Sequence, residues 1–169
     1  MPTNIIIFGQ GGHSKVVCDT LIRFNHKIVN IFDDNPRETD FSIFKNIQIK
    51  SPPQDISKYQ AWHVAIGDNL SRMRIIERYS SNRERLFSVI SDAADVSGYS
   101  SISNGCFVAP NSVIGIDSVI GMGCIINHCA VIDHDCFIEN GVHIAPNSTL
   151  GGNVKIGEGT FVGAGSTIL

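Results

Sequence analysis

The stretch SVIGIDSVIGMGCIINHCAVI, residues 112–132, carries an isoleucine at every sixth position. The spacing continues in both directions, because an Ile, Val or Leu stands at each sixth residue from Ile90 to Ile168 without a missed position. Two residues before each of these, from Ala94 onward, the residue is small in nearly every hexad. A period of six fits neither a helix nor a β-hairpin, and it is typical of a hexapeptide repeat.

Such a repeat predicts a parallel β-helix in which each flat face takes one hexad and three faces complete a coil of eighteen residues. The aliphatic residues would then point into the prism and stack about 4.8 Å apart from coil to coil. From Ile90 to Ile168 the register never slips. We therefore expect a little over four coils with no inserted loop.

Residues 1–85 follow a different pattern, which predicts a small doubly wound α/β unit. NIIIFG (4–9) is typical of a buried strand, and HSKVVCDTLIRF (13–24) of the helix that follows it. KIVNIFDDN (27–35) and AWHVAIGDN (61–69) predict two further strands, and LSRMRIIERYS (70–80) predicts a helix capped by Asp68 or Asn69. Residues 37–60 are irregular, and residues 81–96 are expected to join this domain, 1–85, to the β-helix, 86–169.

The composition excludes several classes of partner. Thirteen Lys and Arg against sixteen Asp and Glu give a net charge of −3, which provides no electrostatic footprint for nucleic acid or an anionic membrane. No signal peptide or membrane-spanning run is visible, so we expect a soluble cytoplasmic protein. The five cysteines form no C-x-x-C pair and are expected to be small core residues.

The turn GQGGHS, residues 9–14, lies between the first strand and the first helix. Gly11 and Gly12 would let backbone N–H groups approach a phosphate at the helix N-terminus, and Asp33 lies about 20 residues further on, where an acid can accept from ribose hydroxyls. Because 85 residues hold only one mononucleotide half, a sugar nucleotide fits better than NAD. The alternative is a tight turn with no ligand.

Three histidines lie within the repeat. Asp135 follows His134 directly, so a carboxylate could orient the imidazole of a general base. Eighteen residues on, one coil above, Gly152 could bring a backbone N–H close to a reacting carbonyl. His143 precedes the inward Ile144 and should point outward, to the surface or an interface. His128 follows the inward Ile126 by two positions, as His134 follows Ile132, but it lies on the neighbouring face.

The order of the motifs IIIFGQGGHS (5–14), IFDDN (31–35), VAIGDN (64–69) and VIDHDCFIENGVHIAPNSTLGGNVKIG (131–157) resembles the bacterial sugar acyltransferases of the sialic acid O-acetyltransferase type. That group includes acetyl-CoA-dependent N-acetyltransferases of nucleotide-linked 4-amino sugars, and the resemblance covers essentially the whole chain. It implies a Rossmann-like N-terminal domain that holds the nucleotide sugar and a left-handed parallel β-helix. It also implies homotrimers with active sites between subunits, and a role in glycan or surface polysaccharide synthesis.

Carried over residue by residue, the resemblance makes His134 the general base and Asp135 its partner, where family members often have glutamate. Acetyl-CoA would lie beside His143 and accept a hydrogen bond from the backbone of Gly152. Family chains continue past Leu169, so we expect either a shortened chain or an incomplete coenzyme A site. The sugar-nucleotide site would be formed by Gly11, Gly12, His13, Ser14, Asp33, Asp34, Ile66, Gly67 and Asn69.

The reaction so implied is direct acetyl transfer from acetyl-CoA to an amine or hydroxyl of a sugar, without a metal, and the motifs favour a UDP-linked 4-amino sugar over other acceptors. Two alternatives belong to other classes. One is a zinc-dependent hydrase of the trimeric β-helix type, with His128, His134 and His143 as ligands. The other is a non-catalytic scaffold that binds nucleotide sugars.

Overall fold

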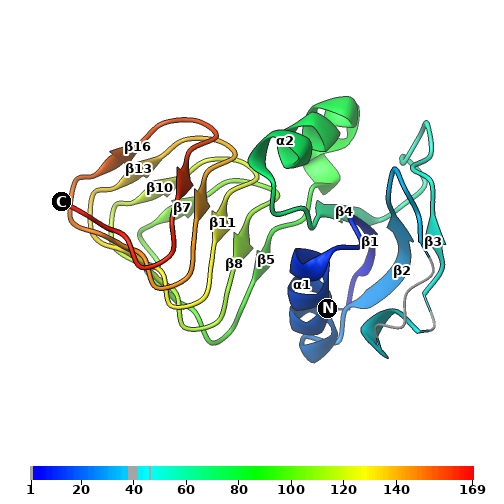
Figure 1. The fold of residues 1–169 in the computed structure, drawn as a ribbon, viewed down its shortest axis with the longest axis horizontal. Helices are drawn as coiled ribbons and strands as arrows, with labels where there is room; N and C mark the ends of the chain where they lie inside the picture. The colour runs from blue at the N-terminus through cyan, green and yellow to red at the C-terminus, as the bar shows by residue number, and fades with distance from the viewer. Residues whose placement is uncertain (1, 38–41, 46) are drawn as a thin grey trace. The chain divides into compact units, whose positions relative to one another are not determined.

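The computed structural model describes residues 2–37, 42–45 and 47–169, and the chain divides into two compact units, Met1–Phe87 and Ser88–Leu169 (Figure 1). The first unit is an α/β domain and the second a parallel β-helix, so the predicted fold class is confirmed. Among the described residues, no helix has the length and apolar character needed to cross a membrane.

The N-terminal unit contains a four-stranded parallel sheet in the order β3-β2-β1-β4. Strand β1 is buried almost completely, as expected for a central strand of a parallel sheet with both faces covered. The strands are β1 (Asn4–Phe8), β2 (Lys27–Phe32), β3 (Ile49–Lys50) and β4 (Ala61–Val64), and the helices are α1 (Gly12–Arg23), α2 (Asn69–Arg78) and the 3₁₀ turns η1 (Ser42–Phe44) and η2 (Ser80–Arg85).

The predicted strands and helices of this unit are confirmed, with one addition. Asp68 is the N-cap of α2, and its Oδ2 accepts a hydrogen bond from the backbone N–H of Ser71 at 2.8 Å. Strand β3 lies within residues 37–60, which the sequence indicated to be irregular. Two paired residues are too few to produce an alternating pattern, so this strand left no periodic signal. Residues 38–41 and 46 of that stretch lie outside the described residues.

The C-terminal unit consists of two-residue strands on three flat faces, named here by their first strands (Figure 1). Each strand pairs in parallel with the strand eighteen residues away, as the repeat predicted. The β5 face holds β5 (Val89–Ile90), β8 (Phe107–Val108), β11 (Ile125–Ile126), β14 (His143–Ile144) and β17 (Phe161–Val162). The β6 face holds β6 (Asp95–Val96), β9 (Val113–Ile114), β12 (Val131–Ile132), β15 (Thr149–Leu150) and β18 (Thr167–Ile168), and the β7 face holds β7 (Ser101–Ile102), β10 (Val119–Ile120), β13 (Phe137–Ile138) and β16 (Lys155–Ile156).

From Val96 to Ile168 the aliphatic residue of each hexad packs into the interior of the prism, as expected, whereas Ile90 at the start of the repeat is 40% exposed. In the middle coils the small residue two positions earlier is also buried, and several of these residues donate to a carbonyl fifteen residues later, as Ser118 does to Asp133 at 2.7 Å. Cys106, Cys124 and Cys136 occupy this position, which confirms their predicted role as core residues. Cys129 differs, because it is exposed at a corner.

A left-handed turn residue follows each inward aliphatic residue by three positions from Gly105 to Gly165. Glycine, asparagine and aspartate adopt this conformation at the lowest cost, and they hold every such position except Cys129. The residues are Gly105, Asn111, Asp117, Gly123, Cys129, Asp135, Gly141, Asn147, Asn153, Gly159 and Gly165. These corners therefore share one turn conformation, and the chain bends in the same sense at each of them.

Residues 81–96, predicted to join the two domains, contain more regular structure than a linker. They include most of η2 and the first two strands of the β-helix, β5 and β6. The hexads already begin at Ile90, so the β-helix takes up the C-terminal part of this segment.

Candidate functional site

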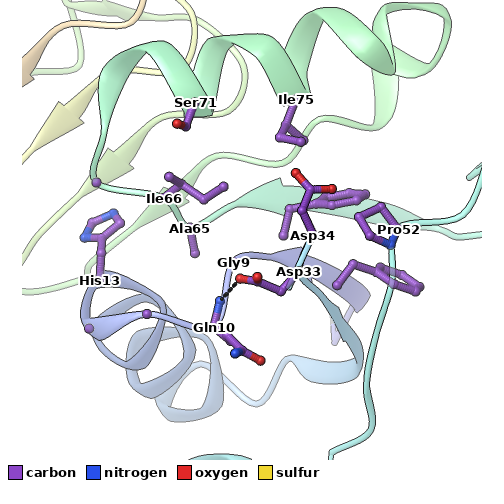
Figure 2. A pocket seen from close by; sticks show the side chains of 15 residues that line it. Gly9, Gln10, His13, Asp33, Asp34, Pro52, Ala65, Ile66, Ser71 and Ile75 are labelled. Carbon is purple, nitrogen blue, oxygen red and sulfur yellow. Dashed lines mark hydrogen bonds between the residues drawn. The ribbon is translucent and has the colours of Figure 1, made fainter. Parts of the chain in front are cut away.

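A pocket of about 460 Å³ lies within the N-terminal unit, at the carboxyl ends of β1, β2 and β4 (Figure 2). The crevice outside the carboxyl ends of parallel strands is the usual ligand site of open α/β sheets. The pocket is lined by Phe8, Gly9, Gln10, Gly11, Gly12, His13, Phe32, Asp33, Asp34, Pro52, Ala65, Ile66, Gly67, Ser71 and Ile75.

Most of the residues that the sequence assigned to the sugar-nucleotide site line this pocket: Gly11, Gly12, His13, Asp33, Asp34, Ile66 and Gly67. Ser14 and Asn69 do not. Ser14 is fully buried and its hydroxyl lies 3.9 Å from the Cys18 thiol, while the Asn69 side chain accepts a hydrogen bond from Arg72. The sequence missed Pro52 and Ile75, which line the pocket from segments without a motif.

The glycine turn is fixed by contacts to the neighbouring strands. Gly9 has a φ of +105°, and a Cβ there would lie 2.9 Å from the carbonyl oxygen of Ala65, so only glycine fits. Asp33 accepts hydrogen bonds from the backbone N–H groups of Gln10 and Asn35. By contrast, a Cβ at Gly11 or Gly12 would meet no atom of the chain. Open space therefore lies in front of the N-terminus of α1, where a phosphate could bind.

No lysine or arginine is among the described residues that line the pocket. A phosphate bound there would depend on the backbone N–H groups of the turn and on the dipole of α1, whose first turn contains no acidic residue. The side chains of Asp33 and Asp34 would favour ligand groups that donate hydrogen bonds, such as sugar hydroxyls or an amine.

Arg72 lies under the loop that forms one wall of the pocket, and the sequence did not single it out. Its side chain is 1% exposed, and Nη1 donates to the carbonyl oxygens of Ile66 and Gly67 at 2.9 and 3.1 Å. Nη2 donates to Asn69 Oδ1 at 2.8 Å. A buried guanidinium thus fixes the backbone of two pocket residues, and only the helical spacing of α2 could have indicated that this arginine faces inward.

In the β-helix unit, His134 and Asp135 form the hydrogen-bonded pair expected of a base and its partner. His134 Nδ1 lies 2.7 Å from Asp135 Oδ2, so the shorter aspartate reaches the imidazole. The backbone N–H of His134 donates to Asp133 Oδ1 at 2.8 Å. The hydrogen bond to Asp135 and the charges of Asp133 and Asp135 raise the pKa of His134 above its ordinary value. About half of each side chain of the pair is exposed, so a substrate could reach the imidazole.

His143 is less accessible than expected. Its position before Ile144 predicts an outward side chain, but it is only 9% exposed, and its ring packs edge-on against Phe161. Asn127 Nδ2 lies 3.1 Å from His143 Nε2, and Asn127 Oδ1 accepts from the backbone N–H of His128 at 2.9 Å. The second contact fixes the amide orientation, so Asn127 donates to His143 Nε2 and that nitrogen carries no proton.

The three histidines lie at different places on the prism. His134 and Gly152 lie at the corner between the β6 and β7 faces, whereas His128 lies at the corner between the β5 and β6 faces. His143 is part of the β5 face, opposite the corner that holds His134. Within one chain they do not converge, and the part of the chain that the structure describes contains no group of three His, Cys, Asp or Glu residues that could hold a metal.

The chain combines an α/β unit that contains a pocket with a hexapeptide β-helix that carries a histidine–aspartate pair. Two family models agree with this: the PglD N-terminal domain matches residues 4–79, and the bacterial transferase hexapeptide matches residues 135–169. The two models match different parts of the chain, and the resemblance seen in the sequence is confirmed.

Solved structures show the same organisation over the whole chain. The acetyltransferase domain of PglB from Neisseria gonorrhoeae is 28% identical with a TM-score of 0.85, covering 98% of this chain and 82% of that one. Its complex with acetyl coenzyme A gives 27% identity, a TM-score of 0.84, and coverage of 99% and 82%. A histidine-to-asparagine mutant of perosamine N-acetyltransferase from Caulobacter crescentus, in complex with CoA and GDP-perosamine, is 27% identical with a TM-score of 0.82, covering 98% and 88%. A comparison with curated protein sequences finds no match.

Replacing Arg72 with methionine should destabilise the N-terminal unit by about 2 to 4 kcal/mol, because a hydrogen bond to a charged group contributes about 1.5 to 3 kcal/mol and two carbonyls would lose their donor. Unfolding in urea, followed by the fluorescence of Trp62, measures this change, since Trp62 is the single tryptophan and lies in β4. Arg74→Met is the control, because Arg74 is exposed on the same helix. Equal midpoints for the two variants would contradict the role given to Arg72.

Proposed function

We propose that this chain is an acetyltransferase that moves the acetyl group of acetyl-CoA to the amino group of a nucleotide-linked amino sugar. The observation that carries the proposal is the pair of His134 and Asp135 at an exposed corner of the β-helix. The similar structures of known function are acetyltransferases, and one of them is bound to CoA and an amino-sugar nucleotide. We propose that the reaction takes place in the cytoplasm.

His134 would act as the general base. With the Nδ1 proton held by Asp135, Nε2 is the nitrogen that can accept a proton. As the sugar amine attacks the thioester carbonyl, a C–N bond forms, the C–S bond breaks, and Nε2 takes the proton that the amine loses. The thiolate leaves and is protonated to the free thiol of coenzyme A. No covalent bond to the enzyme is needed.

The acetyl-CoA site would combine two copies of the chain. Gly152 shares the corner of His134, whereas His143 lies on the opposite face of the prism, so one copy cannot bring all three to one thioester. A neighbouring copy that packs its β5 face near the corner of His134 would supply His143. A closed threefold assembly gives each corner such a neighbour, and we therefore propose a homotrimer.

The sugar nucleotide would bind in the N-terminal pocket. The open space at Gly11 and Gly12 suits the phosphates, and a Cβ on Gly67 would lie 3.9 Å from the Cβ of His13, so these two residues are neighbours in the lining of the pocket. Asp33 and Asp34 would accept hydrogen bonds from hydroxyl groups of the ligand. None of these contacts distinguishes the base of a UDP-linked sugar from that of a GDP-linked one.

A panel of acceptors tests the proposal directly. Acetyl-CoA is mixed with UDP- and GDP-linked 4-amino sugars, with their 4-hydroxy analogues, and with free sialic-type sugars, and the reaction is followed by thiol release and product mass. We expect release only with a nucleotide-linked amino sugar, with a product heavier by one acetyl group. Transfer only to a hydroxyl or to a free sugar would contradict the proposed acceptor.

Replacing His134 with alanine should lower kcat by about 10² to 10⁴, the usual contribution of a positioned base. The KM values for both substrates should change little, because the imidazole acts on a proton that moves during the reaction. Glu158→Ala is a matched control, since Glu158 is exposed and also follows an inward isoleucine by two positions. Turnover close to that of the native enzyme would remove His134 from the mechanism.

Replacing Asp135 with asparagine should move the acidic limb of the profile of kcat/KM against pH to lower pH. The carboxylate raises the pKa of His134, and a base works only when unprotonated, so the native enzyme loses activity at a higher pH than the variant. The maximal rate should also fall, because an amide orients the imidazole less strongly. Asp117→Asn changes the equivalent turn one coil away and should leave the limb in place.

A further inference from the structure

His134 lies between two glycines at the same corner of the prism, one in the coil below and one in the coil above. Gly115 comes directly after the inward residue Ile114 of the coil below. Gly152 comes two positions after the inward residue Leu150 of the coil above. Neither glycine has a left-handed φ, so neither is required by its backbone conformation. The reason for a glycine at these two positions must therefore be the space that a side chain would occupy.

Gly152 is required by the imidazole. A Cβ built on Gly152 would lie 2.4 Å from Cε1 and 2.5 Å from Nε2 of His134, and 3.1 Å from Nδ1. The first two separations are too short for non-bonded atoms. The clash falls on the nitrogen that the mechanism leaves without a proton, so any side chain at residue 152 would displace the ring or cover its free lone pair.

Gly115 is required by the backbone that carries His134. A Cβ at residue 115 would lie 2.8 Å from the carbonyl carbon of Asp133, 2.8 Å from the backbone nitrogen of His134, and 3.1 Å from the Asp133 carbonyl oxygen. A side chain can rotate away from a clash, but these backbone atoms cannot. Relief would need a local change in the spacing between two coils.

The turn cannot easily move away from either glycine. The backbone N–H of Asp135 donates to the Ile116 carbonyl of the coil below at 3.0 Å, and the His134 carbonyl accepts from Asn153 of the coil above at 2.9 Å. The Asp133 carbonyl also accepts from the Ser118 hydroxyl at 2.7 Å. Widening the gap on one side would lengthen these bonds, so the slot between the two glycines has a fixed width.

We propose that Gly115 and Gly152 are positioning residues that form a slot for His134, in which the imidazole keeps its hydrogen bond to Asp135 and leaves Nε2 open to the substrate. The proposal rests on the proposed function in that it takes His134 as the base. It assigns to Gly152 a steric role separate from the backbone N–H expected to contact acetyl-CoA. An alanine at this position would keep that N–H.

The first test replaces Gly152 with alanine. Because the imidazole can rotate, the variant should fold with an unchanged unfolding midpoint, but kcat should fall by about 10²-fold, the cost of displacing a catalytic group by about 1 Å. In the protein without substrates, NMR titration of the His134 ring should give a lower pKa than in the native chain, because the ring leaves Asp135. Gly157→Ala, where a Cβ meets nothing within 4 Å, should change neither kcat nor the pKa of His134.

The second test compares Gly115→Ala with Gly121→Ala. A Cβ at Gly121 would clash in the same way with backbone atoms of Glu139 and Asn140, at 2.7 Å, but that turn carries no catalytic side chain. Both variants should lower the unfolding midpoint to a similar extent. Only Gly115→Ala should also lower kcat and the pKa of His134.

Native kcat and native His134 titration in Gly152→Ala would overturn the proposal, as would equal losses of kcat in Gly115→Ala and Gly121→Ala. A raised KM for acetyl-CoA in Gly152→Ala, with the titration of His134 unchanged, would also overturn it and assign the glycine to substrate binding alone. If the native chain transfers no acetyl group, the proposed function fails. A lowered pKa of His134 in Gly152→Ala, measured without substrates, would still support the slot.

Discussion

Backbone hydrogen bonding between coils eighteen residues apart is the constraint on which the β-helix depends. Each two-residue strand pairs with the equivalent strand of the neighbouring coil, on both sides in the middle coils, and the inward aliphatic residues stack along three lines. A residue's place in the hexad therefore decides whether its side chain is in the core, on a face or at a corner. Chemistry is confined to the corners and outer faces, and His134 occupies a corner where two neighbouring coils determine its surroundings.

The sequence predicted those features that follow from period and spacing. The inward residues repeat at a regular interval, and the pair of His134 and Asp135 is adjacent in the chain, as is the cap of α2, for which the sequence offered Asp68 or Asn69 and the structure has Asp68. Features that depend on contacts between distant residues were missed. Arg72 is buried under a loop, and Asn127 bonds to His143 sixteen residues away, and neither contact leaves a pattern in the sequence.

The same reasoning explains why three predicted site residues have other surroundings than their place in the sequence suggested. Ser14 follows the glycine turn directly in sequence, but it begins the buried side of α1 and faces away from the pocket. Asn69 is close in sequence to the pocket residues Ile66 and Gly67, but its side chain accepts a hydrogen bond from Arg72. His143 alternates outward as its strand requires, yet Phe161 and Asn127 cover much of it. Proximity in sequence placed these residues near the site, and packing decided the direction of each side chain.

The aspartate beside His134 suits the geometry of the corner. Residue 135 is the left-handed turn position, with a φ of +58°, and aspartate tolerates this conformation better than longer acidic side chains do. In that conformation its carboxylate reaches Nδ1 at 2.7 Å without the additional rotatable bond of glutamate. Fewer rotamers are lost when the pair forms, so the backbone turn supplies part of the order that a longer side chain would have to provide.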